Sequence, residues 1–519
     1  MTRLPDFHAA KWDEPVIYEI GRQGARGQIF DAPEKRVADA VGTDLIPHAM
    51  SRKDTPDLPE ITEFEAQRHF LHLSQMTLGM MGISLFGTCT MKYNSKAAEF
   101  ATLRPELAEV HPFQHPDTLQ GVLEIIHDFD GILQNLSGMD QFIFQAGGGA
   151  DAAYTMATVA RAYWADKGML GQRTEMVTSV QAHPCNPATA AAAGFDVVNL
   201  PLEENGYPYL EALKAAVSEK TALIMINNPD DMGIYNPEIK EWTRIAKEAG
   251  ALCFYDHANF NGVMGKLSAR ELGFDACMFM LHKTFGAPKA GGGPAVGAFG
   301  CTAQLAPYVP GPVVVKEGDS YILDEDRSKS TGKVREYWGN VPQVVKAYAW
   351  ARAMGAEGIN LASDISVVAN NYMDKKLAEI PGLEISNPDN GAWRMEMTRW
   401  SLGPLTEETG VSTVHFANRM ADYGIDPYWM SHEPWIVAEP FTPEAGELWS
   451  KEDIDTWIAV IAKIAKEARE NPDMVKSAPH NQPVAQAKGD AFEDPAKWAM
   501  TWRAYQRKVI GDETKKGVA

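Results

Sequence analysis

The sequence contains little cysteine and no paired cysteine motif. Its 519 residues include five cysteines, which are scattered along the chain and never form a C-x-x-C pair. This spacing argues against a disulfide framework and against a structural zinc site, so no metal is expected. Unpaired thiols are also typical of a reducing compartment, which favours the cytoplasm.

Long apolar runs and an excess of basic residues are missing as well. No stretch approaches the roughly 20 apolar residues that cross a bilayer, and the first residues, "MTRLPDFHAAKWDEP", lack the apolar core of a signal peptide. Asp and Glu outnumber Lys and Arg by 69 to 48, which gives a net charge of -21. Such a surface repels phosphate backbones and anionic lipids, so we expect neither nucleic acid nor membrane as a partner.

The length of the chain predicts more than one domain. A chain of 519 residues with 45% hydrophobic residues exceeds what a single core usually holds. The first 60 residues are rich in proline and charge and are typical of an arm that lies over another surface. We therefore predict an arm (1–60), a large domain (61–345), a smaller C-terminal α+β domain (346–485) and a tail (486–519).

Short apolar runs alternate with helical patterns in the predicted large domain. Continuous apolar strands separated by helices are typical of a mostly parallel α/β sheet that is covered on both faces. A further strand, "GLEIS", and a long amphipathic helix over 451–472 are expected in the smaller domain. The candidate strands of the large domain are 141–145, 176–180, 195–200, 222–228, 251–257 and 276–283.

Three of these strands end in polar residues. The first ends at Asn227-Asn228, the second at Asp256-His257 and the third at His282-Lys283. Because ligands bind beyond the carboxyl ends of the strands in open parallel sheets, these ends are expected to lie together at one site.

An aspartate and a lysine delivered in this way suit pyridoxal 5'-phosphate (PLP). The amine of Lys283 would form a Schiff base with the cofactor aldehyde, and Asp256 would keep the pyridine nitrogen protonated, so that the ring accepts electrons. Each residue also has a plainer interpretation, since Asp256 could cap a helix and Lys283 could be a solvated cation at a strand end. Taken together on adjacent strands, the two residues favour the cofactor.

The PLP phosphate needs backbone donors, and a glycine-rich turn can supply them. In "QAGGGADAAYTMATVARAYW" (145–164) a strand leads through three glycines into a helix. The amides of Gly148, Gly149 and Ala150 would face the phosphate, with Asp151 near the helix start. A tight strand–helix connection is the alternative, and the spacing matches neither a Rossmann nor a Walker motif.

A flat side chain that stacks on the cofactor ring is also expected. His183 follows the strand at 176–180 and could take this position. A histidine that caps the following helix is an equally good interpretation of the same residue.

The motifs of the chain resemble a known family. From about residue 60 to 485 the chain is similar to the PLP-bearing half of the glycine cleavage P-protein, glycine dehydrogenase (decarboxylating) subunit 2. The stretches that carry the resemblance are "GTCTMKYN" (87–94), "HPFQ" (111–114), "HPCNPATAAAAGF" (183–195), "NNPDDMGIY" (227–235), "DHANFNGVMGK" (256–266), "GFDACMFMLHKTF" (273–285), "GGGPAVG" (291–297) and "SAPHNQPV" (477–484).

The resemblance implies a fold and the roles of several residues. The fold would be PLP-dependent transferase fold type I, the aspartate-aminotransferase-like architecture. Lys283 would be the Schiff-base lysine, Asp256 the pyridinium partner, His183 the stacking residue and the turn around Gly149 the phosphate site. Asn228, Ala258 and His282 would adjoin the cofactor, and the loop over 87–94 would line the substrate site with Thr90, Lys92, Tyr93 and Asn94.

The family's activity is implied in the same way. A member would decarboxylate glycine on PLP and pass an aminomethyl group to a lipoylated carrier protein, together with a subunit-1 partner. Fold type I sites are normally shared across a dimer interface, so an oligomer of at least two chains is expected.

The chain departs from the family pattern near the expected site. Ala152-Ala153 replaces a Gly-Glu pair, Cys185 and His257 replace small residues, and Lys289-Ala290 stands in the glycine-rich turn after the lysine. These changes are either neutral, or they mark a different substrate or the loss of transfer to the lipoyl carrier protein. His257 and Lys289 are further substrate-binding candidates. Two alternatives therefore stay open: a diverged decarboxylase or lyase for another, possibly acidic, amino acid, and a non-catalytic partner subunit. Retention of Lys283 and Asp256 speaks against the second.

Overall fold

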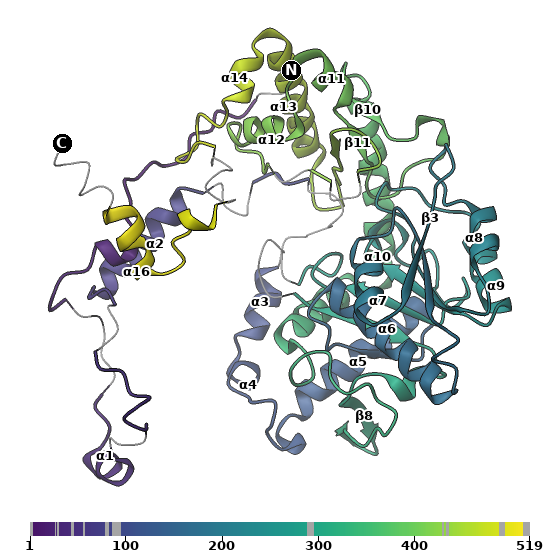
Figure 1. Cartoon of the computed structure of the whole chain (residues 1–519), viewed down its shortest axis with the longest axis horizontal. Coiled ribbons are helices and arrows are strands. Elements are labelled where there is room, and N and C mark those ends of the chain that lie inside the picture. The colour runs from purple at the N-terminus through teal and green to yellow at the C-terminus, as the bar shows by residue number, and fades with distance from the viewer. Residues whose placement is uncertain are drawn as a thin grey trace.

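A computed structural model shows two packed domains with an arm that extends away from them (Figure 1). It describes residues 4–25, 27, 31–42, 46–54, 58–77, 82–85, 95–287, 295–427, 430–431, 435–486 and 494–511. Within these ranges, no helix has the length and apolar character that crossing a membrane requires.

The large domain is built on a seven-stranded sheet of order β1-β7-β6-β5-β4-β2-β3. Each of the six predicted runs coincides with a strand, and only β7 runs antiparallel to its neighbours. The missed strand, β7, has the small-residue sequence "GAFGC", which lacks a strong strand pattern. The strands are β1 Gln141–Ile143, β2 Glu175–Ser179, β3 Asp196–Leu200, β4 Thr221–Asn227, β5 Leu252–His257, β6 Ala276–Met280 and β7 Gly297–Cys301.

Helices cover both faces of this sheet, as the continuous apolar strands predict. On one face α6 (Gly149–Asp166) and α7 (Cys185–Ala192) pack on the even-numbered residues of β5, such as Phe254. The opposite face carries the odd-numbered residues of β5, such as Tyr255, and is covered by α5 (Gln120–Ser137), α8 (Leu210–Ala216) and α9 (Ile239–Glu248). A small hairpin, β8 (Val313–Glu317) and β9 (Ser320–Asp324), lies beside α5.

The smaller domain follows α10 (Val341–Leu377), a helix kinked at Gly355. A three-stranded antiparallel sheet of order β10-β11-β12 packs with the end of α10 and four further helices around a core that includes Trp400 and Trp457. The predicted strand "GLEIS" contains β10, and the predicted amphipathic helix is α13. The elements are β10 Glu384–Ile385, β11 Trp400–Ser401, α11 Gly403–Thr409, α12 Thr413–Ala421, β12 Pro440–Phe441, α13 Lys451–Glu470 and α14 Pro472–Lys476.

The arm contacts the smaller domain through its first residues, where the N–H of Ala9 donates to the carbonyl of Asn481 at 3.0 Å, and contacts the tail farther along. Tyr18 stacks on Trp502 with ring centroids 5.1 Å apart, and Figure 1 shows α2 beside α16, away from both domains. Several large apolar side chains of α2, including Phe64, Phe70 and Leu71, are exposed. The helices of this part are α1 Lys35–Val41, α2 Glu63–Gln75 and α16 Trp502–Tyr505, while α3 Lys96–Thr102 and α4 Pro105–Ala108 lie beside the body.

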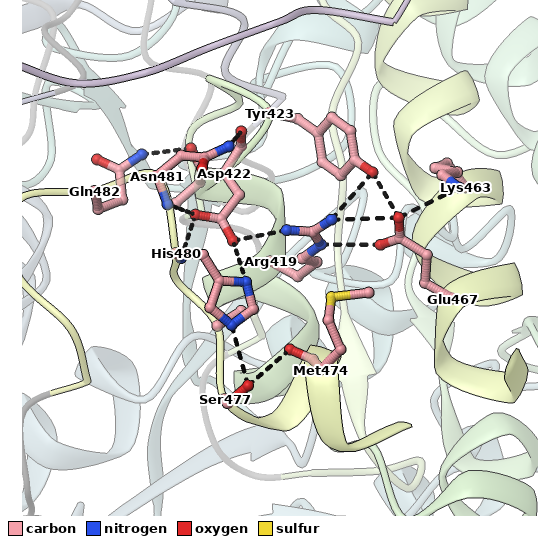
Figure 2. Close-up of polar contacts among 12 residues, drawn as sticks. Arg419, Asp422, Tyr423, Lys463, Glu467, Met474, Ser477, His480, Asn481 and Gln482 are labelled. Atoms are coloured by element: carbon pink, nitrogen blue, oxygen red, sulfur yellow. Dashed lines mark hydrogen bonds and ion pairs between the residues drawn. The ribbon is translucent and has the colours of Figure 1, made fainter. Parts of the chain in front are cut away.

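The segment "SAPHNQ" (477–482) is fastened to the smaller domain by one buried carboxylate (Figure 2). Asp422 accepts hydrogen bonds from the backbone N–H groups of His480, at 2.6 Å, and Asn481, at 2.7 Å. Its other oxygen lies 2.9 Å from Nη1 of Arg419, which is bound in turn by Glu467 on α13. Asp422 therefore ties the C-terminal segment to α12 and α13, and the contact explains why a stretch without regular structure keeps a fixed path.

Candidate active site

The three polar strand ends lie side by side, as predicted. Strands β4, β5 and β6 are neighbours in the sheet, and Asn227 pairs with Asp256. Strand β6 ends at Met280, and Lys283 lies in the turn that follows, where its N–H donates to the carbonyl of Met280 at 3.0 Å. The carboxylate and the amine thus come from adjacent strands at the carboxyl edge of the sheet.

Asp256 is a buried carboxyl held in place by two hydrogen bonds. Its Oδ1 accepts from the N–H of Ala258 at 2.9 Å, and its Oδ2 accepts from Nδ2 of Asn186 on α7 at 3.0 Å. Burial raises its pKa to about 6, although both hydrogen bonds and the positive charge of Lys283 act in the opposite direction. A carboxylate in this setting is stabilised by a cationic group placed against it.

Lys283 is buried rather than solvated. Its side chain is 4% exposed, and its charge lowers the pKa values of Asp256, Cys185 and Glu396. The alternative interpretation of a strand-end cation in water is therefore wrong. Because burying a lysine costs free energy, a lysine at such a place commonly has a chemical role.

The glycine-rich turn leaves space in front of the first turn of α6. Gly148 is extended, and a Cβ atom added to it would meet no other atom within 4 Å. Asp151 Oδ2 accepts from the N–H of Gly147 at 2.9 Å and lies 3.4 Å from Nη1 of Arg335. The turn therefore combines backbone N–H groups at a helix start with an arginine that the sequence alone did not reveal.

His183 makes the capping contact that its second interpretation predicts. Its Nδ1 accepts from the N–H of Cys185, the first residue of α7, at 3.1 Å. This bond fixes the orientation of the ring, so stacking on a cofactor stays a prediction. Burial raises the pKa of the Cys185 thiol, and the charges of Asp256 and Lys283 also act on it. Cys185, one of the departures from the family pattern, therefore lies at the site.

His257 and His282 are both held neutral. The ring centroid of His257 lies 3.7 Å from that of Tyr255 and 5.2 Å from that of Phe279, on the sheet face opposite Asp256. Burial lowers the pKa of His257 to about 3. Burial and the charge of Lys283 lower the pKa of His282 to about 4, and its Nδ1 is 3.2 Å from the carbonyl of Val296. These contacts give His257 a packing role, and its contact with a substrate stays a prediction.

Hydrogen bonds between residues of the loop after β4 hold this loop in place. Asn228 exchanges two hydrogen bonds with the backbone of Asn236, at 3.1 and 2.7 Å. Asp230 accepts from the N–H groups of Met232 and Ile234 at 2.8 and 2.9 Å. Asn228 therefore shapes this loop, and any contact with a cofactor stays a prediction.

The smaller domain contributes charged residues that sequence reasoning missed. Glu396 and Arg399 lie just before β11 and are 0% and 2% exposed. Asp231 acts electrostatically on both, and Lys283 also acts on Glu396. The signal in the sequence is weak, because "RMEMTRW" resembles an ordinary solvent-facing alternation until the domains are packed together.

Five predicted substrate residues lie outside the described part of the chain. Leu85, the last described residue before one of the two segments involved, accepts at its carbonyl from the N–H of Glu444 in the smaller domain at 3.2 Å. The residues concerned are Thr90, Lys92, Tyr93, Asn94 and Lys289.

The described residues fit PLP. The open space before Gly148 suits a phosphate group at a helix N-terminus, and the buried carboxyl of Asp256 suits a protonated ring nitrogen. Lys283 supplies the amine that such a cofactor needs. The three features come from separate elements around one sheet. Their burial keeps them together, which residues on an exposed surface would not achieve.

Comparisons with known proteins agree with this arrangement. The family model "Aminotransferase class-V" matches residues 133–405. Similar proteins from several organisms carry the name "Probable glycine dehydrogenase (decarboxylating) subunit 2". Those of Pyrococcus abyssi and Thermococcus kodakarensis are 39% and 40% identical, each over 96% of this chain and 98% of their own. That of Caldanaerobacter subterraneus is 37% identical over 90% of this chain and 95% of its own.

Solved structures show the same fold at lower identity. A crystal structure of "glycine decarboxylase (P-protein) of the glycine cleavage system, in inhibitor-bound form" superposes with a TM-score of 0.70 and 19% identity, covering 84% of this chain and all of that one. A "NIFS-like protein" superposes with a TM-score of 0.58 and 17% identity, covering 74% of this chain and all of that one. Fold type I, expected from the sequence, is confirmed.

Proposed function

Because the chain belongs to the family of glycine dehydrogenase (decarboxylating) subunit 2, a family of PLP enzymes, we propose that it decarboxylates glycine and passes an aminomethyl group to a lipoylated carrier protein. The observation that carries this proposal is the pairing of Asp256 and Lys283 on neighbouring strand ends, both buried. When bound, PLP supplies an electron sink for the carbanion left by decarboxylation.

The chain's own residues have distinct tasks in this proposal. Lys283 holds the cofactor aldehyde, Asp256 holds the protonated ring nitrogen, and the backbone of Gly148 and Gly149 holds the phosphate. His183 covers the ring, with its orientation fixed by the N–H of Cys185. The segment over 87–94 binds the substrate carboxylate.

A partner subunit completes the proposed enzyme. The name of the relatives implies a subunit 1, and the exposed apolar side chains of α2, which follows the arm, support a protein partner for this part of the chain. We propose an assembly of at least two chains in the cytoplasm. Light scattering of the chain alone and after co-expression with its partner tests this, and a monomer in both samples contradicts it.

Release of labelled carbon dioxide tests the reaction. The full chain, the partner subunit and a lipoylated carrier are mixed with carboxyl-labelled glycine and PLP, and Lys283→Ala serves as the inactive control. The proposal predicts release that requires Lys283 and PLP. Absence of release from a complex that binds PLP rules out glycine as the substrate.

A second substrate class is favoured by one observation. Arg399 is 2% exposed, and its Nη2 has no hydrogen-bond partner, while Nε donates to Oγ1 of Thr442 at 3.4 Å. A buried guanidinium with an open donor suits an additional carboxylate, which an acidic amino acid would bring. Titration of the holoenzyme absorbance with glycine, aspartate and glutamate separates the two classes. A response to glycine alone, unchanged in Arg399→Gln, excludes the acidic substrate.

A further inference from the structure

Asn186 is a buried amide that bonds to the carboxyl group of Asp256. It lies in the first turn of α7 and is 0% exposed, and its Nδ2 donates to Oδ2 of Asp256 at 3.0 Å. The backbone N–H of Ala258 donates to the other oxygen, Oδ1, at 2.9 Å. Two donors from different elements, α7 and the segment after β5, therefore fix the plane of the carboxyl group.

The Asn186 amide has a second neighbour that selects one of its two orientations. Its Oδ1 lies 3.7 Å from Sγ of Cys185, and burial raises the pKa of this thiol, so the sulfur keeps its proton and can donate. The reversed amide would place Oδ1 against the Asp256 oxygen, where two acceptors meet without a proton when Asp256 is ionised. The thiol of Cys185 therefore orients the amide, and the amide orients the carboxyl group.

The backbone around Asn186 is fixed as well. The N–H of Asn186 donates to the carbonyl of His183 at 2.9 Å, and the N–H of Cys185 donates to Nδ1 of the same histidine at 3.1 Å. One turn, residues 183–186, thus carries both the histidine proposed to cover the cofactor ring and the amide that holds Asp256. Asn186 reaches the carboxyl group from a rigid support, which is what a precise site needs.

A ring nitrogen that carries a proton requires a carboxylate with its charge and an open acceptor position. The two N–H donors stabilise the ionised carboxyl group and leave each oxygen one further lone-pair site. We propose that Asn186 is a positioning residue that holds Asp256 ionised and in one orientation, and that the chain's preference for a cofactor with a basic ring nitrogen depends on this contact. The inference rests on the proposed function, in which Asp256 holds that nitrogen.

Comparison of two ligands tests the inference. One is PLP, and the other is 1-deazapyridoxal 5'-phosphate, in which a C–H group replaces the ring nitrogen. Equilibrium dialysis of the full-length chain at about pH 8, where Asp256 with its pKa of about 6 is ionised, gives both dissociation constants. In Asn186→Ala the constant for PLP should rise about tenfold, or about 1.4 kcal/mol, the low end of what a hydrogen bond to a charged group contributes. The constant for the analogue should stay unchanged or fall, because the analogue lacks the nitrogen through which Asp256 acts.

Asn370→Ala is the matched control. Asn370 on α10 is also 0% exposed, and its Nδ2 donates to the carbonyl of Met395 at 3.0 Å and to Oγ1 of Thr398 at 2.9 Å. Its replacement should leave the ratio of the two dissociation constants as it is in the wild type, because these partners belong to the smaller domain.

Three results overturn the inference. They are an equal change of both constants in Asn186→Ala, a loss selective for PLP in Asn370→Ala, and a wild-type chain that binds the two ligands equally well. Dialysis requires neither glycine nor a partner subunit. A chain that shows the expected selectivity and releases no carbon dioxide from glycine therefore counts against the proposed reaction alone.

A second variant keeps the inference testable if Asn186→Ala does not fold. Cys185→Ala removes the thiol that faces Oδ1 of Asn186, so the preference for PLP over the analogue should fall about twofold, as suits a weak S–H donor. Cys277→Ala, which removes a buried thiol of β6, is its control and should keep the wild-type preference. An unchanged preference in Cys185→Ala, or an equal fall in Cys277→Ala, overturns the orientation assigned to the Asn186 amide.

Discussion

The carboxyl of Asp256 should make the cofactor-free chain less stable than its amide replacement. Burial raises its pKa from 3.8 to about 6. A carboxyl whose pKa is higher in the folded state stabilises the fold below its unfolded pKa and loses that contribution as the pH rises through its folded pKa. Above about pH 6 the shift of roughly two units corresponds to about 3 kcal/mol of lost stability.

Asp256→Asn removes this loss and changes one hydrogen bond. The amide oxygen can still accept from Ala258, whereas its nitrogen faces the donor of Asn186, a mismatch worth about 1 kcal/mol. The variant should therefore be about 2 kcal/mol more stable at about pH 8. At about pH 5 the stability that the wild type loses through ionisation of Asp256 should fall to roughly half. Thermal melts of both proteins without PLP at the two pH values measure this.

Two results would refute the reasoning. One is a variant that melts below the wild type at about pH 8, which would mean that the carboxylate is stabilised in the folded chain. The other is an advantage that does not shrink toward about pH 5, because only titration of Asp256 links the effect to pH. Added PLP should narrow the difference, since the cofactor brings the cation that Asp256 lacks.

Other substitutions test separate parts of the structure. Lys283→Ala should abolish the covalent attachment of PLP, measured by mass spectrometry after borohydride reduction, while the melting temperature of the cofactor-free chain stays the same or rises; retained attachment contradicts the assignment. Gly233→Ala should lower the melting temperature and loosen the domain seam, because φ is +77° and the added Cβ would lie 1.8 Å from the carbonyl oxygen of Met397; an unchanged melt argues against this packing. Asp422→Ala should speed hydrogen exchange over 477–482, since two N–H groups there lose their acceptor; unchanged protection would show that other contacts hold the segment.

The sequence predicted the sheet and its polar edge because both depend on local patterns. Continuous apolar runs gave six of the seven strands, and the chain order of strand and helix placed Asp256 beside Lys283. The residues that it missed, Asn186, Arg335, Glu396 and Arg399, reach the site from other elements, and their roles appear only after the helices and domains pack. In an irregular segment the sequence shows no periodicity, so it does not indicate whether a charged residue is buried at the site or exposed to solvent.

The site contains buried acids whose ionisation the fold disfavours. Asp230, Asp256 and Glu396 all have pKa values raised by burial, to about 7, 6 and 7, so each carries an unfavourable charge at or above neutral pH. Packing alone gives no reason to place Asp256 and Glu396 where the charge of Lys283 acts on both, since apolar residues of similar size would fill the space at less cost. Perturbed titratable groups that converge on one buried amine are typical of a catalytic site. Retention of this unfavourable arrangement is therefore an argument against a non-catalytic partner subunit, and it does not depend on sequence similarity.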